Sequence, residues 1–298
     1  MVSQIIEHHF GSAPRRITHK PSGLTNLVFD VVHREGHFVV RLSQDPARIN
    51  AYQKEQWVQA RVRAVGVPTP EILEVGNEVV PHPYMISRCV EGVEATHHPE
   101  RLAIARELGA VAKRIHGVRT RGFGRTFDWS GNTLSRNESW PGYLTHELRI
   151  DERIETLARL RMLDAPRLPR LRSVARELRR WRKRPSLNHA DLRLKNVIVE
   201  AASGRIVALI DWENCESNVA PYWDFAFALH DLGIDAKQEF LEGYGLPWKR
   251  LVSMAPAIKA INLLGYAPVL AELAAAGKKA ALAAHRARFA GAFDLYTL

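Results

Sequence analysis

The sequence NHADLRLKN at residues 188–196 is followed by the segment IDWE at residues 210–213. In the first segment, His189, Asp191 and Asn196 form the pattern H-x-D-x-x-x-x-N. Asp211, in the second segment, adds another carboxylate. Phosphoryl transfer uses such groups: one carboxylate positions a hydroxyl, and further oxygen ligands hold magnesium. The chain contains 13 histidines, so the pattern alone is not specific and its context decides the interpretation.

The residues between Asn196 and Asp211 predict a β-hairpin. The β-branched run Val197–Val199 and the apolar run Ile206–Ile210 flank turn-forming residues at 201–204. An antiparallel hairpin sets the start of its first strand beside the end of its second, with the strands ~5 Å apart. We therefore expect Asn196 and Asp211 to lie together and to share a Mg²⁺ ion, which takes few ligands from protein.

The three acidic positions of this region have simpler alternatives. Glu213 follows Asp211 closely enough to reach a second metal ion, but Asp211 and Glu213 could also be the solvated charges of an exposed strand end. Asp191 could likewise be a turn residue or a helix N-cap. The neighbouring motifs decide between these alternatives.

Three further segments precede or follow this loop in a characteristic order: HFVVRL at residues 37–42, PYMISRCVEG at 83–92 and PYWDFAFAL at 221–229. With them, residues 15 to 245 resemble the aminoglycoside phosphotransferase and choline kinase superfamily of small-molecule kinases, which share the protein-kinase fold. The resemblance implies an α+β chain of two lobes. Residues 1–91 would form a small antiparallel-sheet lobe that binds nucleotide and ends in the hinge. Residues 92–298 would form a larger, mainly helical lobe with the catalytic loop, the metal site and the acceptor pocket.

The resemblance assigns phosphate-binding roles in the first lobe. Ser22 and Gly23 would belong to the turn that covers the phosphates, although an ordinary hairpin turn has the same composition. Arg41 stands where protein kinases carry the phosphate-binding lysine, and its guanidinium keeps the charge with a different donor geometry. Glu55, on a helix expected from residue 50 to 65, would pair with Arg41. The alternatives are an exposed edge-strand arginine and a surface glutamate.

Adenine and the acceptor would be handled elsewhere in the chain. Main-chain groups between Ser87 and Cys89 would contact adenine. Asp191 would accept a hydrogen bond from the acceptor hydroxyl, and Arg193 would neutralise charge near the γ-phosphate unless it is only a surface arginine. Asp224 would bond back to the backbone of the catalytic loop, and its alternative role is a helix cap.

The bulk composition fits a globular enzyme. The chain has 298 residues, of which 46% are hydrophobic, so it is long enough for two lobes with a sizeable core. Two cysteines are too few for a disulfide framework. The N-terminus lacks the apolar core of a signal peptide, and Lys259, Gly265, Pro268 and Glu272 interrupt the apolar segment 257–276. We expect a cytoplasmic protein without a membrane span.

The net charge of +10 bears on partners. Arginines are dense between residues 153 and 184, which raises nucleic-acid binding as an alternative function. Aromatic residues hardly interleave with these arginines, and leucines recur at helical spacing, so solvated faces of amphipathic helices are the favoured interpretation and nucleic acid is not expected. An aminoglycoside is a polycation that needs an acidic pocket, so a neutral or anionic alcohol is at least as good a candidate acceptor.

The sequence thus predicts transfer of the γ-phosphoryl group of ATP or GTP, with Mg²⁺, to a hydroxyl of a small molecule. The alternative is a pseudokinase-type module that binds nucleotide without transfer, for which Arg41 and the single glycine of the phosphate turn leave room. The acceptor and the oligomeric state stay open at this stage.

Overall fold

The computed structural model describes residues 1–21, 27–126, 137–290 and 292–293. The chain divides into two compact units. The first unit combines residues 1–104 with residues 194–214, and the second combines residues 105–193 with residues 215–298. The candidate metal ligands therefore fold with the N-terminal sheet, while the segment with Asp191 folds with the helices. The domain boundary expected at residue 91 stays a prediction.

An antiparallel sheet with the strand order β1-β2-β3-β5-β4 organises the first unit. The strands are β1 Arg16–Lys20, β2 Leu27–His33, β3 Gly36–Leu42, β4 Ile72–Gly76 and β5 Tyr84–Arg88. The strand expected at residues 37–42 matches β3 within one residue. This sheet confirms the antiparallel N-terminal part of the predicted fold class.

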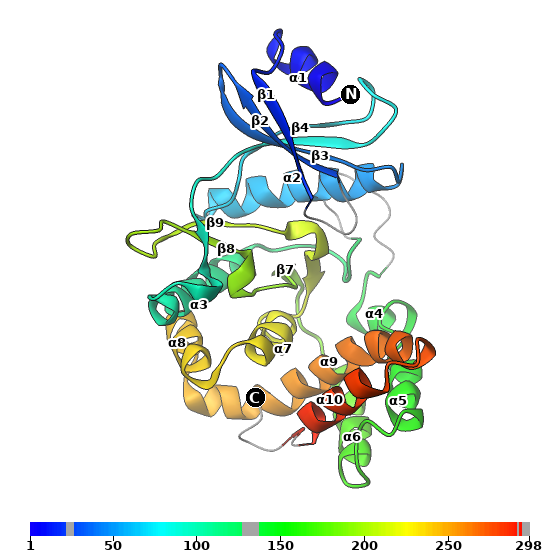
Figure 1. Cartoon of the computed structure of the whole chain (residues 1–298). Coiled ribbons are helices and arrows are strands. Elements are labelled where there is room, and N and C mark those ends of the chain that lie inside the picture. Colours follow the sequence, from blue (N-terminus) through cyan, green and yellow to red (C-terminus); the bar gives the residue numbers. More distant parts are fainter. Residues whose placement is uncertain (22–26, 127–136, 291, 294–298) are drawn as a thin grey trace. The chain divides into compact units, whose positions relative to one another are not determined.

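The two faces of this sheet have different neighbours. Side chains alternate along β3, so Val40 and Leu42 join a core with helix α1 (Val2–Phe10), and Arg41 points to the opposite face. Helix α2 (Arg48–Ala64) packs against β4 and β5 and supplies the partner of Arg41 (Figure 1). The sheet therefore buries one face in an apolar core and places a cation on the other.

A second, smaller sheet completes the first unit. It has the order β6-β8-β9, with β6 Val93–Glu94, β8 Val197–Val199 and β9 Ile206–Leu209. Short 3₁₀ helices flank it: η1 Ala95–His97, η2 Leu194–Asn196 and η3 Trp212–Asn214. The predicted hairpin between Asn196 and Asp211 is confirmed, with Val197 paired to Leu209.

The second unit is mainly helical, as the fold class predicts. Helix α3 (Arg101–Gly117) enters it from the first unit, and the other helices are α4 Trp140–His146, α5 Ile150–Arg159, α6 Arg167–Arg179, α7 Tyr222–Asp231, α8 Ile234–Tyr244, α9 Trp248–Ala275 and α10 Lys279–Phe289. A short antiparallel pair joins β7 (Ser186–Asn188) to β10 (Glu216–Asn218). The catalytic-loop candidate begins directly after β7.

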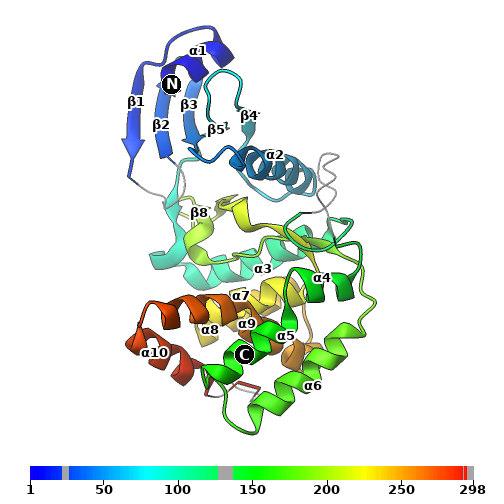
Figure 2. The same ribbon diagram turned by 90° about the vertical axis from the view of Figure 1, so that its right-hand side faces the viewer.

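Helix α9 is the central element of this unit, since α5, α6, α7 and α10 all pack against it (Figure 2). Among the described residues it is the one helix whose length and composition would suffice for a membrane span, yet most of its apolar window is buried by the protein. Leu263, Leu264 and Leu270 are fully buried within it. Its hydrophobicity is explained by its place in the core.

Helices α3 and α8 approach each other through two glycines. A Cβ atom at Gly243 would lie 1.8 Å from the main-chain oxygen of Arg106, and one at Gly109 would lie 2.0 Å from that of Phe240. We expect Gly243→Ala to lower the free energy of unfolding by about 1–3 kcal/mol, because the backbones must separate to admit a methyl group. Urea unfolding measures this change. Gly233→Ala, where no atom lies within 4 Å of the added Cβ, is the control and should change stability much less.

Candidate active site

The candidate metal ligands lie at one end of the β8–β9 hairpin. The main-chain N–H of Ile210 donates to the main-chain oxygen of Asn196 over 2.9 Å. Asp211 follows Ile210 in the chain, so Asn196 and Asp211 lie at the same edge of the hairpin, as predicted. Asn196 is only 4% exposed. The donor set of one amide and one carboxylate consists of hard oxygen atoms, which fits Mg²⁺. Their metal-binding role stays a prediction.

Asp211 adopts an unusual backbone conformation. Its φ of 65° lies in the left-handed region, which residues other than glycine rarely occupy. Such conformations cost about 1–3 kcal/mol and occur where the surrounding structure enforces them, most often at functional sites. Asp211 lies two residues beyond the end of β9 and directly before η3, so the hairpin on one side and the 3₁₀ turn on the other constrain its conformation.

Glu213 contacts helix α2. Its Oε2 lies 2.5 Å from Nη2 of Arg48, and its main-chain oxygen accepts a hydrogen bond from Nζ of Lys54 over 3.2 Å. The carboxylate therefore links η3 to α2. A second metal ion at Glu213 would have to compete with Arg48, so this role stays a prediction that the observed ion pair does not favour.

Arg41 forms the ion pair that the sequence predicted. Its Nη2 lies 2.5 Å from Oε2 of Glu55, which is 1% exposed, and its guanidinium lies over the ring of Tyr52. Burial alone would lower the pKa of Arg41, but the Glu55 carboxylate outweighs it and raises the pKa. Arg41 is thus a fixed cation. The other oxygen of Glu55, Oε1, has no hydrogen-bond partner among the described residues.

The remaining nucleotide-binding predictions in the first unit divide into two groups. Ser22 and Gly23 lie outside the described residues. Ser87 lies within β5, and the N–H of Cys89 donates to the oxygen of His37 over 2.9 Å, so Cys89 continues the pairing of β5 with β3. The main-chain N–H of Cys89 therefore donates within the sheet. Which main-chain groups contact adenine stays a prediction.

Asp191 lies in the second unit, on a loop whose backbone Asp224 holds. Asp224 accepts hydrogen bonds from the N–H of His189 over 3.0 Å and from the N–H of Ala190 over 2.6 Å. Ala190 has a left-handed φ of 64°. His189 in turn accepts, at Nδ1, a hydrogen bond from the N–H of Asp191 over 3.3 Å. The expected contact of Asp224 with the loop backbone is confirmed, and it stabilises a conformation that alanine disfavours.

Asp224 has a second partner that the sequence did not predict. Nε2 of His116, on α3, lies 2.8 Å from its Oδ2, and Nδ1 of His116 lies 3.0 Å from the hydroxyl of Tyr244 on α8. Asp224 is 0% exposed, so a carboxylate there requires such partners. These hydrogen bonds thus connect the loop of Asp191 to helices α7, α3 and α8 of the second unit. The sequence holds no signal for His116, because a histidine near a helix end is common.

Arg193 contacts two carboxylates. Its Nε lies 2.5 Å from Oδ1 of Asp191 and 2.8 Å from Oδ2 of Asp231. The N–H is not directed at either oxygen, so these contacts are ion pairs rather than hydrogen bonds. Arg193 is therefore more than a surface arginine, although a role at the γ-phosphate would require it to leave Asp191. The carboxylate of Asp231 is thus compensated by an arginine.

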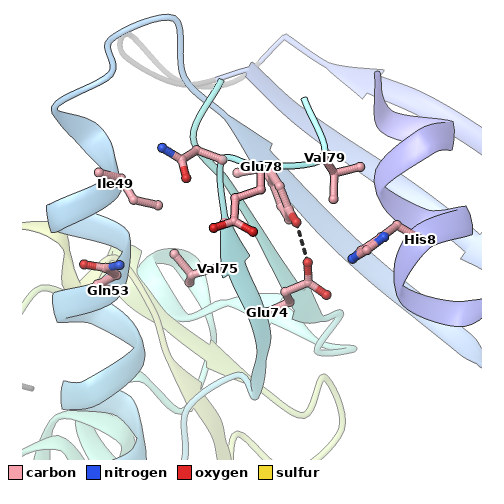
Figure 3. A pocket seen from close by; sticks show the side chains of 10 residues that line it. His8, Ile49, Gln53, Glu74, Val75, Glu78 and Val79 are labelled. Carbon is pink, nitrogen blue, oxygen red and sulfur yellow. Dashed lines mark hydrogen bonds between the residues drawn. The ribbon is translucent and has the colours of Figure 1, made fainter. Parts of the chain in front are cut away.

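The first unit also contains a cavity of about 490 Å³ between α1, the start of α2 and the β4–β5 segment (Figure 3). His8, Gln53, Glu74 and Glu78 line it. Glu74 already accepts a hydrogen bond from the Tyr84 hydroxyl, and its other oxygen lies 2.5 Å from Nδ1 of His9. None of the predicted site residues lines this cavity.

The chain is similar to known proteins in its sequence pattern and in its fold. A model of the phosphotransferase enzyme family matches residues 17–255. No curated protein matches the chain. Among solved structures, aminoglycoside phosphotransferase APH(4)-Ia is similar with a TM-score of 0.71 and 19% sequence identity, covering 96% of this chain and 95% of that one.

Two liganded structures are also similar. The ternary complex of a thermostable mutant of APH(4)-Ia with AMP-PNP and hygromycin B has a TM-score of 0.68 and 19% identity, covering 96% of this chain and 95% of that one. The GDP and kanamycin complex of APH(2")-IIia has a TM-score of 0.65 and 16% identity, covering 95% of each chain. At such identities the similarity shows the fold, and the family model, which spans well over half of the sequence, shows that the chain belongs to the phosphotransferase enzyme family.

Proposed function

We propose that this protein transfers the γ-phosphoryl group of ATP or GTP to a hydroxyl of a small molecule. The observation that carries the proposal is the loop of Asp191, which Asp224 fixes through two main-chain N–H groups despite the left-handed Ala190. A helix cap or a turn residue would not need such support. Membership of the phosphotransferase family and the nucleotides bound in similar structures, AMP-PNP and GDP, support the same function.

Each group has a proposed part in the reaction. Asp191 accepts a hydrogen bond from the acceptor hydroxyl and orients its oxygen toward the γ-phosphorus. The new O–P bond forms as the bond from the γ-phosphorus to the β–γ bridging oxygen breaks, the hydroxyl proton passes to Asp191, and the nucleoside diphosphate leaves. Because the transition state is loose, positioning contributes more than strong basicity.

The residues of the first unit have the proposed role of binding the nucleotide and its metal ion. Asn196 and Asp211 would hold Mg²⁺, which would neutralise phosphate charge when bound. Arg41, fixed by Glu55, holds the nucleotide phosphates with its guanidinium. The cytoplasm, where both nucleotides are available, is the proposed location.

Glu55→Gln tests the nucleotide-binding part of this proposal. Loss of the carboxylate releases the Arg41 guanidinium, so we expect the KM for nucleotide to rise about tenfold or more, the effect of one charge-assisted hydrogen bond. Steady-state kinetics with a varied nucleotide concentration measure it. Glu71→Gln is the control: Glu71 pairs with Arg88 at the surface, where such pairs contribute little, so the KM should not change. Equal effects of the two variants would contradict the role of Glu55.

The enzyme test uses Mg²⁺-dependent consumption of ATP and GTP by the purified protein with a panel of hydroxyl compounds. The panel includes aminoglycosides, choline, amino acid alcohols, sugars, sugar acids and sugar phosphates. Turnover that needs both an acceptor and Asp191 supports phosphotransfer. Binding of nucleotide without turnover across the panel would favour the alternative, a nucleotide-binding module.

A further inference from the structure

Three side chains that can each bind a metal ion come together on one face of the N-terminal sheet. They are Asp30 on β2, His37 on β3 and Cys89, which directly follows β5. Their potential ligand atoms, a carboxylate oxygen, a ring nitrogen and the thiol sulfur, all lie within 4.8 Å of one another. Nε2 of His37 and Oδ1 of Asp30 lie 2.8 Å apart. We refer to these three residues as the Asp-His-Cys cluster.

The pairing of the strands explains this arrangement. Asp30 lies opposite Val39, and His37 lies two residues before Val39, so both side chains leave the same face of the sheet. The main-chain N–H of Cys89 donates to the main-chain oxygen of His37 over 2.9 Å, which places Cys89 beside His37. All three residues belong to the first unit. The backbone of one sheet therefore holds the cluster together.

The protein partly encloses the cluster. Asp30 is 8% exposed, which is unusual for an aspartate, and Cys89 is half-buried. Burial alone would raise the pKa of Asp30, but hydrogen bonds and charges from His37 and Lys20 outweigh it and lower the pKa. Burial, followed by the charge of Asp30, raises the pKa of the Cys89 thiol. The cluster thus contains a carboxylate in a place where a cation would stabilise both the carboxylate and a thiolate.

The three kinds of ligand select a class of metal. Carboxylate, imidazole and thiolate together are typical of Zn²⁺ and related transition metals, whereas Mg²⁺ prefers oxygen atoms. Zn²⁺ forms bonds of about 2.0–2.3 Å, so the ligand atoms of a tetrahedral site lie roughly 3.3–3.8 Å apart. The side chain of His37 is 38% exposed, so it can rotate to reach this spacing. Three protein ligands leave the fourth position of the metal to water.

We propose that Asp30, His37 and Cys89 form a binding site for Zn²⁺ or a related transition-metal ion. The ion takes the place of the hydrogen bond between His37 and Asp30. The imidazole binds in its neutral form through one nitrogen and keeps its proton on the other, and the thiol proton of Cys89 passes to solvent. The bound ion links β2, β3 and the segment after β5. This inference goes beyond the proposed phosphotransfer and does not rest on it.

Lys20 opposes the binding of a cation at this place. Its Nζ lies 3.3 Å from Oδ1 of Asp30, but its side chain is 50% exposed, so the ammonium group can move into solvent when a metal ion binds the carboxylate. Lys20→Gln should therefore tighten Zn²⁺ binding about tenfold, because one like charge near the ion is lost. Such a gain does not arise from damage to the fold. Unchanged or weaker binding by Lys20→Gln would contradict the proposed place of the ion.

Co²⁺ is the first probe, because its charge-transfer absorption reports a bond to sulfur. The purified protein, treated with a chelator and kept reduced, should show this absorption on titration with Co²⁺ and saturate near one ion per chain. Zn²⁺ should displace the Co²⁺, following the usual order of affinities. Cys89→Ser should abolish the absorption. Absence of the absorption in the wild type, or its persistence in Cys89→Ser, would overturn the inference.

A matched pair of histidine variants tests the ring nitrogen. His37→Gln should weaken Zn²⁺ binding about a hundredfold, at least as much as the loss of an outer-shell partner of a metal. His19→Gln is the control: His19 is an exposed residue of the neighbouring strand β1, and its ring lies against Phe29, 5.1 Å away. Competition with a chromophoric chelator measures both affinities, and thermal unfolding shows that the variants fold. Equal affinities of His37→Gln and His19→Gln would overturn the inference.

Alkylation gives a readout that needs no absorbing metal. Zn²⁺ should slow the reaction of iodoacetamide with Cys89 in the wild type, but not in His37→Gln, as followed by mass spectrometry. Cys215 is 0% exposed, and its lack of reaction is the internal sign that the protein stays folded. If Zn²⁺ left the alkylation of Cys89 unchanged in the wild type, the cluster would be only a hydrogen-bonded pair beside a free thiol, and the metal site would be refuted.

Discussion

Replacing Asp191 with asparagine is expected to lower kcat about a thousandfold or more, while the affinity for nucleotide changes little. Asparagine has nearly the same shape but cannot take the hydroxyl proton, and general-base catalysis by a positioned carboxylate contributes roughly 10²–10⁴-fold. Loss of its charge also releases Arg193, 2.5 Å away, which adds to the effect. Single-turnover kinetics for transfer and equilibrium titration for nucleotide measure the two quantities separately.

A control variant separates chemistry from charge. Asp235→Asn removes an exposed carboxylate in the first turn of α8, and kcat should stay at the wild-type level. Thermal unfolding of Asp191→Asn should remain close to that of the wild type, which shows that the loop still folds. Wild-type turnover by Asp191→Asn would contradict the assigned role.

Replacing Asp224 with alanine is expected to reduce the free energy of unfolding by about 3–5 kcal/mol and to abolish most turnover. The change leaves the main-chain N–H groups of His189 and Ala190 without acceptors in a buried region and removes the partner of His116. The left-handed Ala190 then loses the bond that holds it. Urea unfolding gives the stability change, and kinetics near neutral pH on the folded fraction give the rate change.

An intermediate variant distinguishes hydrogen bonding from general disruption. Asp224→Asn keeps one acceptor oxygen for the loop, so its loss of stability should lie between those of the wild type and Asp224→Ala. If Asp224→Ala instead unfolded at the same urea concentration as the wild type, the buried network would contribute nothing and the account of the loop would be wrong.

The hairpin was predictable because its signals are local. β-branched and apolar runs on either side of a Gly-containing turn determine the pairing, and pairing alone brings Asn196 beside Asp211. The ion pair of Arg41 with Glu55 was predictable only through the resemblance, because fourteen residues of chain separate them. Neither propensity nor periodicity links a strand cation to one particular helix glutamate.

Other features depend on contacts that sequence patterns do not encode. Helix α1 was not predicted, although Val2, Ile5 and Ile6 show the spacing of a buried helix face. The partners of Glu213 and Asp224, namely Arg48 and His116, come from distant parts of the chain.

The central claim is phosphoryl transfer, and the most direct measurement follows the phosphorus atom. The purified protein is incubated with Mg²⁺, γ-labelled ATP or GTP and the acceptor panel, and the products are separated and identified. The account predicts that label moves to a hydroxyl of one class of small molecule, that no transfer occurs without Mg²⁺, and that Asp191→Asn reduces transfer about a thousandfold. Label that stays on the nucleotide or appears only as inorganic phosphate, with folded protein that binds nucleotide, would contradict it.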